Sequence, residues 1–232
     1  MIVLSFLFSL FFWIYLEIAI FLIALISYPA VLLPKQGRGF VYFLCGFILK
    51  VLFFICFVRV KVSGTQNLPK KGRFIFISNK PNLLATFSMI AYSPVRVRFA
   101  AEEPIFKVPF LGRVVKAIGC LPVTGRRKDA LTFAGSVFSA LRENEPVLFY
   151  PPNLMRGTAG EFREAELRFI KIAGAALVPI IIRGTEKVFP EGALISPGRV
   201  EILIEPGIPA DDLDDLKAVM HKLQQSYKGA KE

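Results

Sequence analysis

The chain has 232 residues, is 54% hydrophobic and carries a formal net charge of +11. That length fits one compact domain plus a membrane segment. Three cysteines without paired spacing exclude a disulfide framework and a cysteine metal site, and they fit a reducing compartment.

Two apolar runs open the chain. From Ile2 to Leu33 the only ionisable side chain is Glu17, and from Phe40 to Phe57 it is Lys50. A membrane helix needs roughly 20 apolar residues, and a signal peptide would be shorter and preceded by basic residues. Because proline and glycine in "PKQGRG" (Pro34–Gly39) break a helix, we predict a membrane-anchoring helical hairpin. Glu17 and Lys50 are expected to pair with each other or to face protein.

Basic residues stand at both ends of the second run: Lys35 and Arg38 before it, Arg59 and Lys61 after it. Basic residues favour the cytoplasmic side of a membrane. The pattern leaves open whether the hairpin spans the bilayer or dips into one leaflet, and it predicts a soluble domain on the cytoplasmic face.

The rest of the chain alternates short β-branched runs with helical patterns. Strands are predicted at Val58–Val62, Arg73–Ser78, Val95–Ala100, Pro146–Tyr150, Leu177–Ile182 and Val200–Glu205. Helices are predicted at Leu83–Ala91, Val108–Ile118, Asp129–Arg142, Phe162–Ala173 and Asp211–Lys228. This alternation predicts an α/β layered domain with a mostly parallel or mixed sheet. We therefore divide the chain into a hairpin at 1–57 and an α/β domain at 58–232.

Two loops at strand ends stand where such folds place their sites. "NKPN" follows the second predicted strand, and "PPNLMRG" follows the strand "VLFY". Together with the blocks "FKVPFLG" and "LVPIIIRGT", these loops resemble the phospholipid/glycerol acyltransferase family, which includes the 1-acylglycerol-3-phosphate acyltransferases. The resemblance covers most of the chain and implies that family's layered α/β fold, preceded by a hydrophobic hairpin.

The chemical residues of the family motifs are replaced. In the family a histidine takes the proton of the acceptor hydroxyl and an aspartate orients it; these positions are Lys80 and Ala85. An ordinary lysine, with a pKa of about 10.4, is protonated at neutral pH and accepts no proton. The glutamate position of the third motif is Pro152, and Glu102 stands where the second block usually has a lysine. The single histidine, His221, lies in the last predicted helix and is interpreted as an ordinary surface or satisfied side chain, so no catalytic residue is expected.

Several cations remain candidates for substrate binding. Lys80 is suited to hold a lipid phosphate at the start of a helix, where backbone N–H groups also point outward. The resemblance adds Arg126 and Arg127 after the second block, and Arg156 and Arg163 in and after the third. The alternative for each is a solvated surface charge. No metal ligand set and no cofactor are expected.

The sequence leads to two alternative hypotheses about function. The first is an inactive family member, a pseudoenzyme, that binds membrane phospholipid or serves as a structural subunit of a membrane-protein complex. The second is an active lysophosphatidic acid acyltransferase in which Lys80, with a depressed pKa, is the base and acyl-CoA or acyl-acyl-carrier-protein is the donor. The positive charge fits anionic lipid headgroups, and no nucleic-acid-binding motif is recognisable, so nucleic acid is not expected as a partner.

Overall fold

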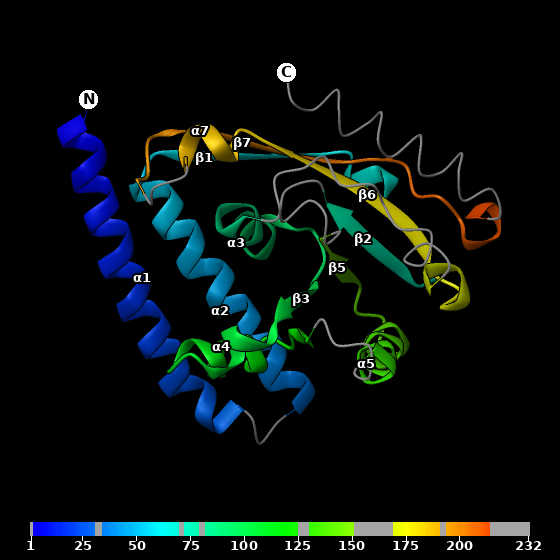
Figure 1. Ribbon diagram of the computed structural model, residues 1–232. Coiled ribbons are helices and arrows are strands. Elements are labelled where there is room, and N and C mark those ends of the chain that lie inside the picture. Colours follow the sequence, from blue (N-terminus) through cyan, green and yellow to red (C-terminus); the bar gives the residue numbers. More distant parts are fainter. Residues whose placement is uncertain are drawn as a thin grey trace.

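The computed structural model describes most of the chain (Figure 1). The described residues are 2–30, 34–69, 72–78, 82–124, 130–150, 169–190 and 194–213. The predicted helices at 162–173 and 211–228 fall largely outside these ranges. Only residues 169–172 of the first are described as helical, and the second begins as the 3₁₀ helix η5 (Ala210–Leu213).

Two long apolar helices form the N-terminal hairpin, α1 (Ile2–Ala30) and α2 (Pro34–Ile55). The predicted helix break at Pro34–Gly39 is wrong, because α2 begins at Pro34 and includes this whole segment. Proline is tolerated in the first turn of a helix, where its missing N–H would have had no partner within the helix. Arg38 therefore lies on a helix rather than in a loop.

Within the described residues, seven strands form one sheet in the order β1-β7-β6-β2-β5-β3-β4. Their bounds are β1 Val58–Ser63, β2 Phe74–Ser78, β3 Arg98–Glu102, β4 Leu121–Val123, β5 Val147–Phe149, β6 Ala176–Arg183 and β7 Gly198–Ile204. All neighbouring pairs are parallel except β6 and β7, which confirms the predicted layered α/β fold with a mostly parallel, mixed sheet. The short strand β4 is absent from the sequence prediction, which also begins β3 at Val95. The strand starts later because Ser93–Val97 turns, with the Ser93 hydroxyl donating to the Val95 carbonyl at 2.8 Å.

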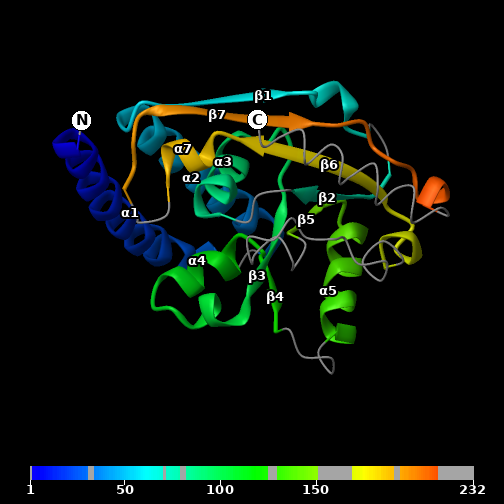
Figure 2. The ribbon, with the colours of Figure 1, turned by 45° about the horizontal axis from the view of Figure 1, so that its top comes forward.

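Helices cover both faces of the sheet (Figure 2). The alternation of strand side chains divides β2 between two apolar clusters. Phe74 and Phe76 belong to the cluster that also contains residues of α1, α2, α3 (Leu83–Tyr92) and α4 (Leu111–Ala117). Ile75 and Ile77 belong to the opposite cluster, which contains residues of α5 (Ala130–Arg142) and the segment 169–173. The hairpin thus shares one hydrophobic core with the sheet, and the division at residue 57 stays a prediction about domains.

Helix α2 packs closely against α3 near its middle. A Cβ atom at Gly46 would lie 3.2 Å from the Ile90 carbonyl oxygen, closer than most real contacts of that kind. The absence of a side chain at Gly46 lets the two backbones approach each other. One helical turn further along α2, the Lys50 ammonium lies 5.5 Å from the centroid of the Tyr92 ring, at the end of α3. Of the two sequence expectations for Lys50, pairing with Glu17 or facing protein, the second fits this contact.

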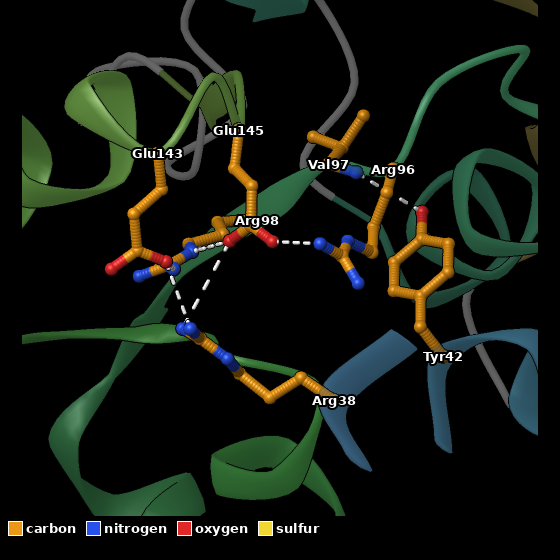
Figure 3. A network of polar contacts seen from close by, with 7 residues as sticks. All are labelled: Arg38, Tyr42, Arg96, Val97, Arg98, Glu143 and Glu145. Carbon is orange, nitrogen blue, oxygen red and sulfur yellow. Dashed lines mark hydrogen bonds and ion pairs between the residues drawn. The ribbon is translucent and has the colours of Figure 1, made fainter. Parts of the chain in front are cut away.

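An ion-pair network ties the start of α2 to the α/β domain (Figure 3). Arg38 donates to Glu143 at 2.8 Å, and Arg98 donates to the same Oε2 atom at 2.8 Å. Glu145 accepts from both Arg98 and Arg96 and lies 3.9 Å from Arg38. Arg98 and Glu145 are each only 8% exposed, so the centre of the network is buried. We call these five residues the clasp.

A second contact lies beside the clasp. The backbone N–H of Val97 donates to the Tyr42 hydroxyl at 3.4 Å (Figure 3). Tyr42 comes one helical turn after Arg38 on α2, so both residues attach the same end of this helix to the segment leading into β3. At its other end, α2 is followed directly by β1. Both ends of α2 therefore contact the α/β domain.

Candidate functional site

The segments that carry the candidate cations all leave one edge of the sheet. Strands β2, β5, β3 and β4 are mutually parallel neighbours, so their carboxyl ends lie together, as in other α/β folds with sites at this edge. Lys80 follows β2, Arg126 and Arg127 follow β4, and Arg156 and Arg163 follow β5. These five residues lie outside the described ranges, so their convergence on one site and their roles remain predictions.

Asn82 fixes the start of α3 at this edge. Its side-chain oxygen accepts from the Ala85 backbone N–H at 2.7 Å, which is a typical N-cap contact. Its amide group donates to the Thr185 hydroxyl at 3.0 Å, and this hydroxyl donates to Glu186 at 3.2 Å. Thr185 begins α7 (Thr185–Val188) just after β6 and is fully buried. Asn82 thus connects the loops that follow β2 and β6.

A second polar contact joins α3 to the end of β5. The hydroxyl groups of Thr86 and Tyr150 lie 3.0 Å apart, and the Thr86 hydroxyl also donates to the Asn82 carbonyl at 3.2 Å. Because a threonine hydroxyl has only one hydrogen, Tyr150 is the donor in the first contact. Burial raises the pKa of Tyr150 above its ordinary value. The phenol is therefore protonated at neutral pH and is no substitute for the missing histidine base.

Ala85 occupies the position of the family aspartate. It is 0% exposed and belongs to the apolar cluster that also contains Phe76 and Met89. A methyl group has no hydrogen-bonding atom, so this position offers nothing to orient a base at residue 80. The chain's single histidine, His221, lies outside the described residues.

A large cavity of about 940 Å³ opens next to this edge. Its walls come from α1, α2, α3, β3, the 3₁₀ helix η2 (Glu103–Lys107) and α4, and most of the lining side chains are apolar. Asn82, Thr86 and Tyr150 are among its polar lining residues. The volume lies at the upper end of the range for pockets that bind small molecules, about 300–1,000 Å³. The cavity can hold a long apolar group with one end near the start of α3.

Cys120 also lines the cavity, but it is a poor nucleophile. Burial raises the pKa of its thiol to about 12. Since the thiolate is the reactive form of cysteine, acyl transfer through a Cys120 thioester is disfavoured at neutral pH.

The "FKVPFLG" block shapes one side of the cavity. A Cβ atom at Gly112 would lie 2.3 Å from the Phe106 carbonyl oxygen, so only glycine fits there. Phe110, at the N-cap of α4, has a φ of 59°, a conformation rare for a residue with a large side chain. Its ring contacts Phe21 of α1 edge to face, with a centroid distance of 5.0 Å. The turn thus holds a lining side chain against the hairpin.

Sequence reasoning missed three residues of the site: Asn82, Thr86 and Tyr150. An asparagine directly before an apolar helix is a recognisable N-cap signal and identifies Asn82. The Thr86–Tyr150 contact joins residues 64 positions apart, and nothing in a single sequence indicates such a contact. The role of Glu17 as a cavity-lining residue was missed for the same reason.

Comparisons with known proteins agree with this architecture. The Acyltransferase family model matches residues 59–183. A chloroplastic 1-acyl-sn-glycerol-3-phosphate acyltransferase (LPAT1) of Arabidopsis thaliana is 26% identical over 209 residues, which are 85% of this chain and 58% of that protein. A 1-acyl-sn-glycerol-3-phosphate acyltransferase of Borreliella burgdorferi is 22% identical over 163 residues, 68% of this chain and 65% of the relative.

A solved structure shares the fold. The 1-acyl-sn-glycerophosphate acyltransferase PlsC from Thermotoga maritima superimposes with a TM-score of 0.81 at 18% identity, covering 98% of this chain and 95% of that one. The chain spans only 58% and 59% of the lengths of the chloroplastic relatives from Arabidopsis thaliana and Brassica napus. Because the family model covers more than half of its residues, the chain belongs to the acyltransferase family.

Proposed function

We propose that this chain is a membrane-associated member of the acyltransferase family that binds the acyl chain of a lipid in its cavity and does not catalyse acyl transfer. The observation that carries the proposal is the cavity itself, which reaches Asn82 and Thr86 at the start of α3. The family acid–base pair is replaced there by Lys80 and the buried Ala85. The binding architecture is thus retained where the proton-transfer groups are replaced.

The membrane is the source of lipid in this proposal. Two helical segments, Phe6–Ser27 and Gly37–Ile55, are long and apolar enough to cross a bilayer. Helix α1 exposes large apolar side chains along its length: Phe6, Leu7, Leu10, Phe11, Ile14, Ile18, Phe21, Leu22, Leu25 and Ile26. An apolar surface of this extent is typical of a membrane or protein contact. We infer that it lies in one leaflet, with phospholipid or a membrane-protein partner against it and the α/β domain on the cytoplasmic side.

The alternative is an active lysophosphatidic acid acyltransferase that uses Lys80 as its base. The names of the relatives favour it, since the proteins from Arabidopsis thaliana and Borreliella burgdorferi are both 1-acyl-sn-glycerol-3-phosphate acyltransferases. It requires a strongly lowered pKa at Lys80, through burial or neighbouring cations.

An acyl-transfer assay separates the inactive lipid-binding protein from the active acyltransferase. We expect no phosphatidic acid above background when the purified protein in nanodiscs receives lysophosphatidic acid with acyl-CoA or acyl-acyl-carrier-protein, measured by mass spectrometry. The physical reason is the absent base, whose loss typically lowers the rate by about 10²–10⁴-fold. Thermotoga maritima PlsC is the positive control for the assay.

Two variants make the result decisive. Turnover that disappears in Lys80→Ala but persists in Lys61→Ala would establish the alternative and refute the inactive assignment. Lys61 is a matched control because it is an exposed lysine on β1, away from the carboxyl edge of β2.

A further inference from the structure

A short segment between β3 and α4 exposes a cluster of apolar side chains. Within the described residues outside the hairpin, seven large apolar side chains are exposed: Leu83, Ile105, Val108, Phe110, Leu131, Ile172 and Leu194. Three of them fall within six consecutive residues, 105–110. We call Ile105, Val108 and Phe110 the knuckle. Single apolar residues scattered over a surface are normal, whereas a cluster of them indicates a contact.

A strained backbone turn presents Phe110 at the surface. The Leu111 backbone N–H donates to the Pro109 carbonyl at 2.6 Å, so Phe110 is the central residue of a three-residue turn. Its φ of 59° and ψ of −55° are those of a γ-turn with positive φ, which is rare and strained. Core packing does not account for the strain, because the Phe110 side chain is 48% exposed. Strain of this kind is commonly found at functional sites.

Local hydrogen bonds hold the knuckle in this conformation. The Val108 N–H donates to the Ile105 carbonyl at 3.3 Å, and the Gly112 N–H donates to the Val108 carbonyl at 2.8 Å. The close approach of Gly112 to the Phe106 carbonyl excludes a side chain at that position. The apolar side chains are therefore presented by a backbone of defined geometry.

The knuckle is continuous with the apolar surface of α1. The rings of Phe21 and Phe110 are in contact, and each is about half exposed. Leu22, Leu25 and Ile26 are exposed at the same end of α1. Figures 1 and 2 both show α4 beside this end of the helix. If α1 lies in a leaflet, as the proposed function states, an apolar group in contact with its exposed side reaches the same layer.

The charged residues around the knuckle are suited to the headgroup layer. Residues 102–116 contain three cations and two carboxylates. Lys107 is 71% exposed and pairs with Glu103, whereas Arg113 and Lys116 are exposed on α4. In segments that lie at a membrane surface, apolar side chains reach the boundary between headgroups and acyl chains while cations stay among the phosphates. Because the carboxylates offset most of the positive charge, the apolar side chains provide the main driving force.

We propose that the knuckle is a membrane contact separate from the hairpin, and that it inserts between the lipid headgroups of the leaflet that holds α1. This inference rests on the membrane association in the proposed function, and not on acyl-chain binding or on the loss of catalysis. A hairpin alone would let the α/β domain rotate about the hairpin axis. A contact beside the hairpin fixes which side of the domain faces the lipid.

A fluorophore attached to single cysteines tests the insertion. The full chain, with its three cysteines replaced by alanine, carries nitrobenzoxadiazole at Val108→Cys, at Leu131→Cys or at Ile14→Cys in phosphatidylcholine nanodiscs. Quenching by phosphatidylcholine that bears a nitroxide near the top of its acyl chain is then measured. We expect quenching at residue 108 at least about twofold stronger than at residue 131, because apolar groups of interfacial segments lie about 5–10 Å deep.

Two of these sites are references. Leu131 is the matched control, because it is an 85% exposed apolar residue on α5, which packs on the opposite face of the sheet. Ile14 lies on the exposed side of α1 and reports whether the hairpin is in the lipid.

Substitutions at Phe110 connect the signal to the knuckle. With the fluorophore at residue 108, Phe110→Ala should lower the quenching by about half, because the apolar area that favours insertion is reduced. Phe110→Leu keeps a large apolar side chain and should retain the quenching. Quenching at residue 14 and the far-ultraviolet circular dichroism spectrum should be unchanged in both variants, which checks that the chain is folded and membrane-bound.

The outcomes separate two failures. Quenching at residue 108 that is no stronger than at residue 131, while residue 14 is quenched, overturns the inference and leaves the membrane association standing. Quenching at residue 108 that is the same in Phe110→Ala as in the unchanged knuckle also overturns it. If residue 14 is not quenched, the membrane association in the proposed function fails, and this inference fails with it.

Discussion

At the scale of single residues, Tyr150 shows how burial changes a side chain's chemistry. Its hydroxyl donates to Thr86 at the end of β5, and burial raises its pKa. The unfolded chain loses this proton near pH 10, where the folded chain still holds it, so the free energy of unfolding should fall as pH rises above about 10. In Tyr150→Phe this alkaline fall should be smaller, and below that pH the lost hydrogen bond should cost about 1 kcal/mol. Urea unfolding across a pH series measures both effects.

Thr86→Val is the matched control for Tyr150→Phe. It removes the same hydrogen bond, together with the one from Thr86 to the Asn82 carbonyl, but leaves the phenol buried, so its alkaline fall should remain at least as steep as in the unchanged protein. Equal pH dependence in the Tyr150→Phe variant and the unchanged protein would mean that Tyr150 titrates normally in the fold.

At the scale of elements, the clasp holds α2 against the α/β domain. Glu145 is only 8% exposed and accepts from the equally buried Arg98 (Figure 3). Glu145→Ala leaves that guanidinium with one fewer anionic partner in a low-dielectric region, and breaking a buried pair in this way typically destabilises a protein by about 3–5 kcal/mol. Thermal unfolding followed by circular dichroism measures the loss. Glu201→Ala is the control, because it removes a half-exposed carboxylate 4.0 Å from Arg199. It should change the free energy of unfolding by less than about 1 kcal/mol. A similar loss of stability in both variants would count against a special role for the clasp.

The elements themselves were largely predictable from the sequence, because β-branched runs and helical periodicity depend on neighbouring residues. Two errors have local causes: Pro34 starts a helix instead of preventing one, and the short strand β4 has only a three-residue pattern. The cavity and the clasp were not predictable, because each combines segments far apart in the chain. Arg38 and Glu143, for example, are separated by 105 positions. The candidate cations derived from motifs lie outside the described residues and stay predictions.

At the scale of the whole molecule, the position of the hairpin constrains its placement in a membrane. A helix of 22 residues is about 33 Å long, enough to cross a bilayer. If α2 crossed, its start would lie on the far side from the α/β domain, yet Arg38 contacts Glu143 of that domain at 2.8 Å. We therefore predict that the hairpin enters and leaves the same leaflet.

Labelling from one side of the membrane tests this placement. With Cys45, Cys56 and Cys120 replaced by alanine, cysteines introduced by Lys35→Cys at the start of α2 and Thr132→Cys on α5 should both react with a membrane-impermeant maleimide added to sealed vesicles of uniform orientation. Both sites should be accessible from the same side. Reaction of the two cysteines from opposite sides of the vesicle would show that α2 crosses the bilayer and that this arrangement of the hairpin is wrong.

The pairing of β1 with β7 has a consequence for how the protein is made. Residues 58–63 find their hydrogen-bonding partners at 198–203, which are synthesised much later. The apolar helices α1 and α2 leave the ribosome long before β7 has been synthesised. Nascent chains generally fold in the order of their synthesis. The lipid surface is then the first apolar environment available to the nascent chain, and β1 gains its partner strand beside it only after β7 has been synthesised.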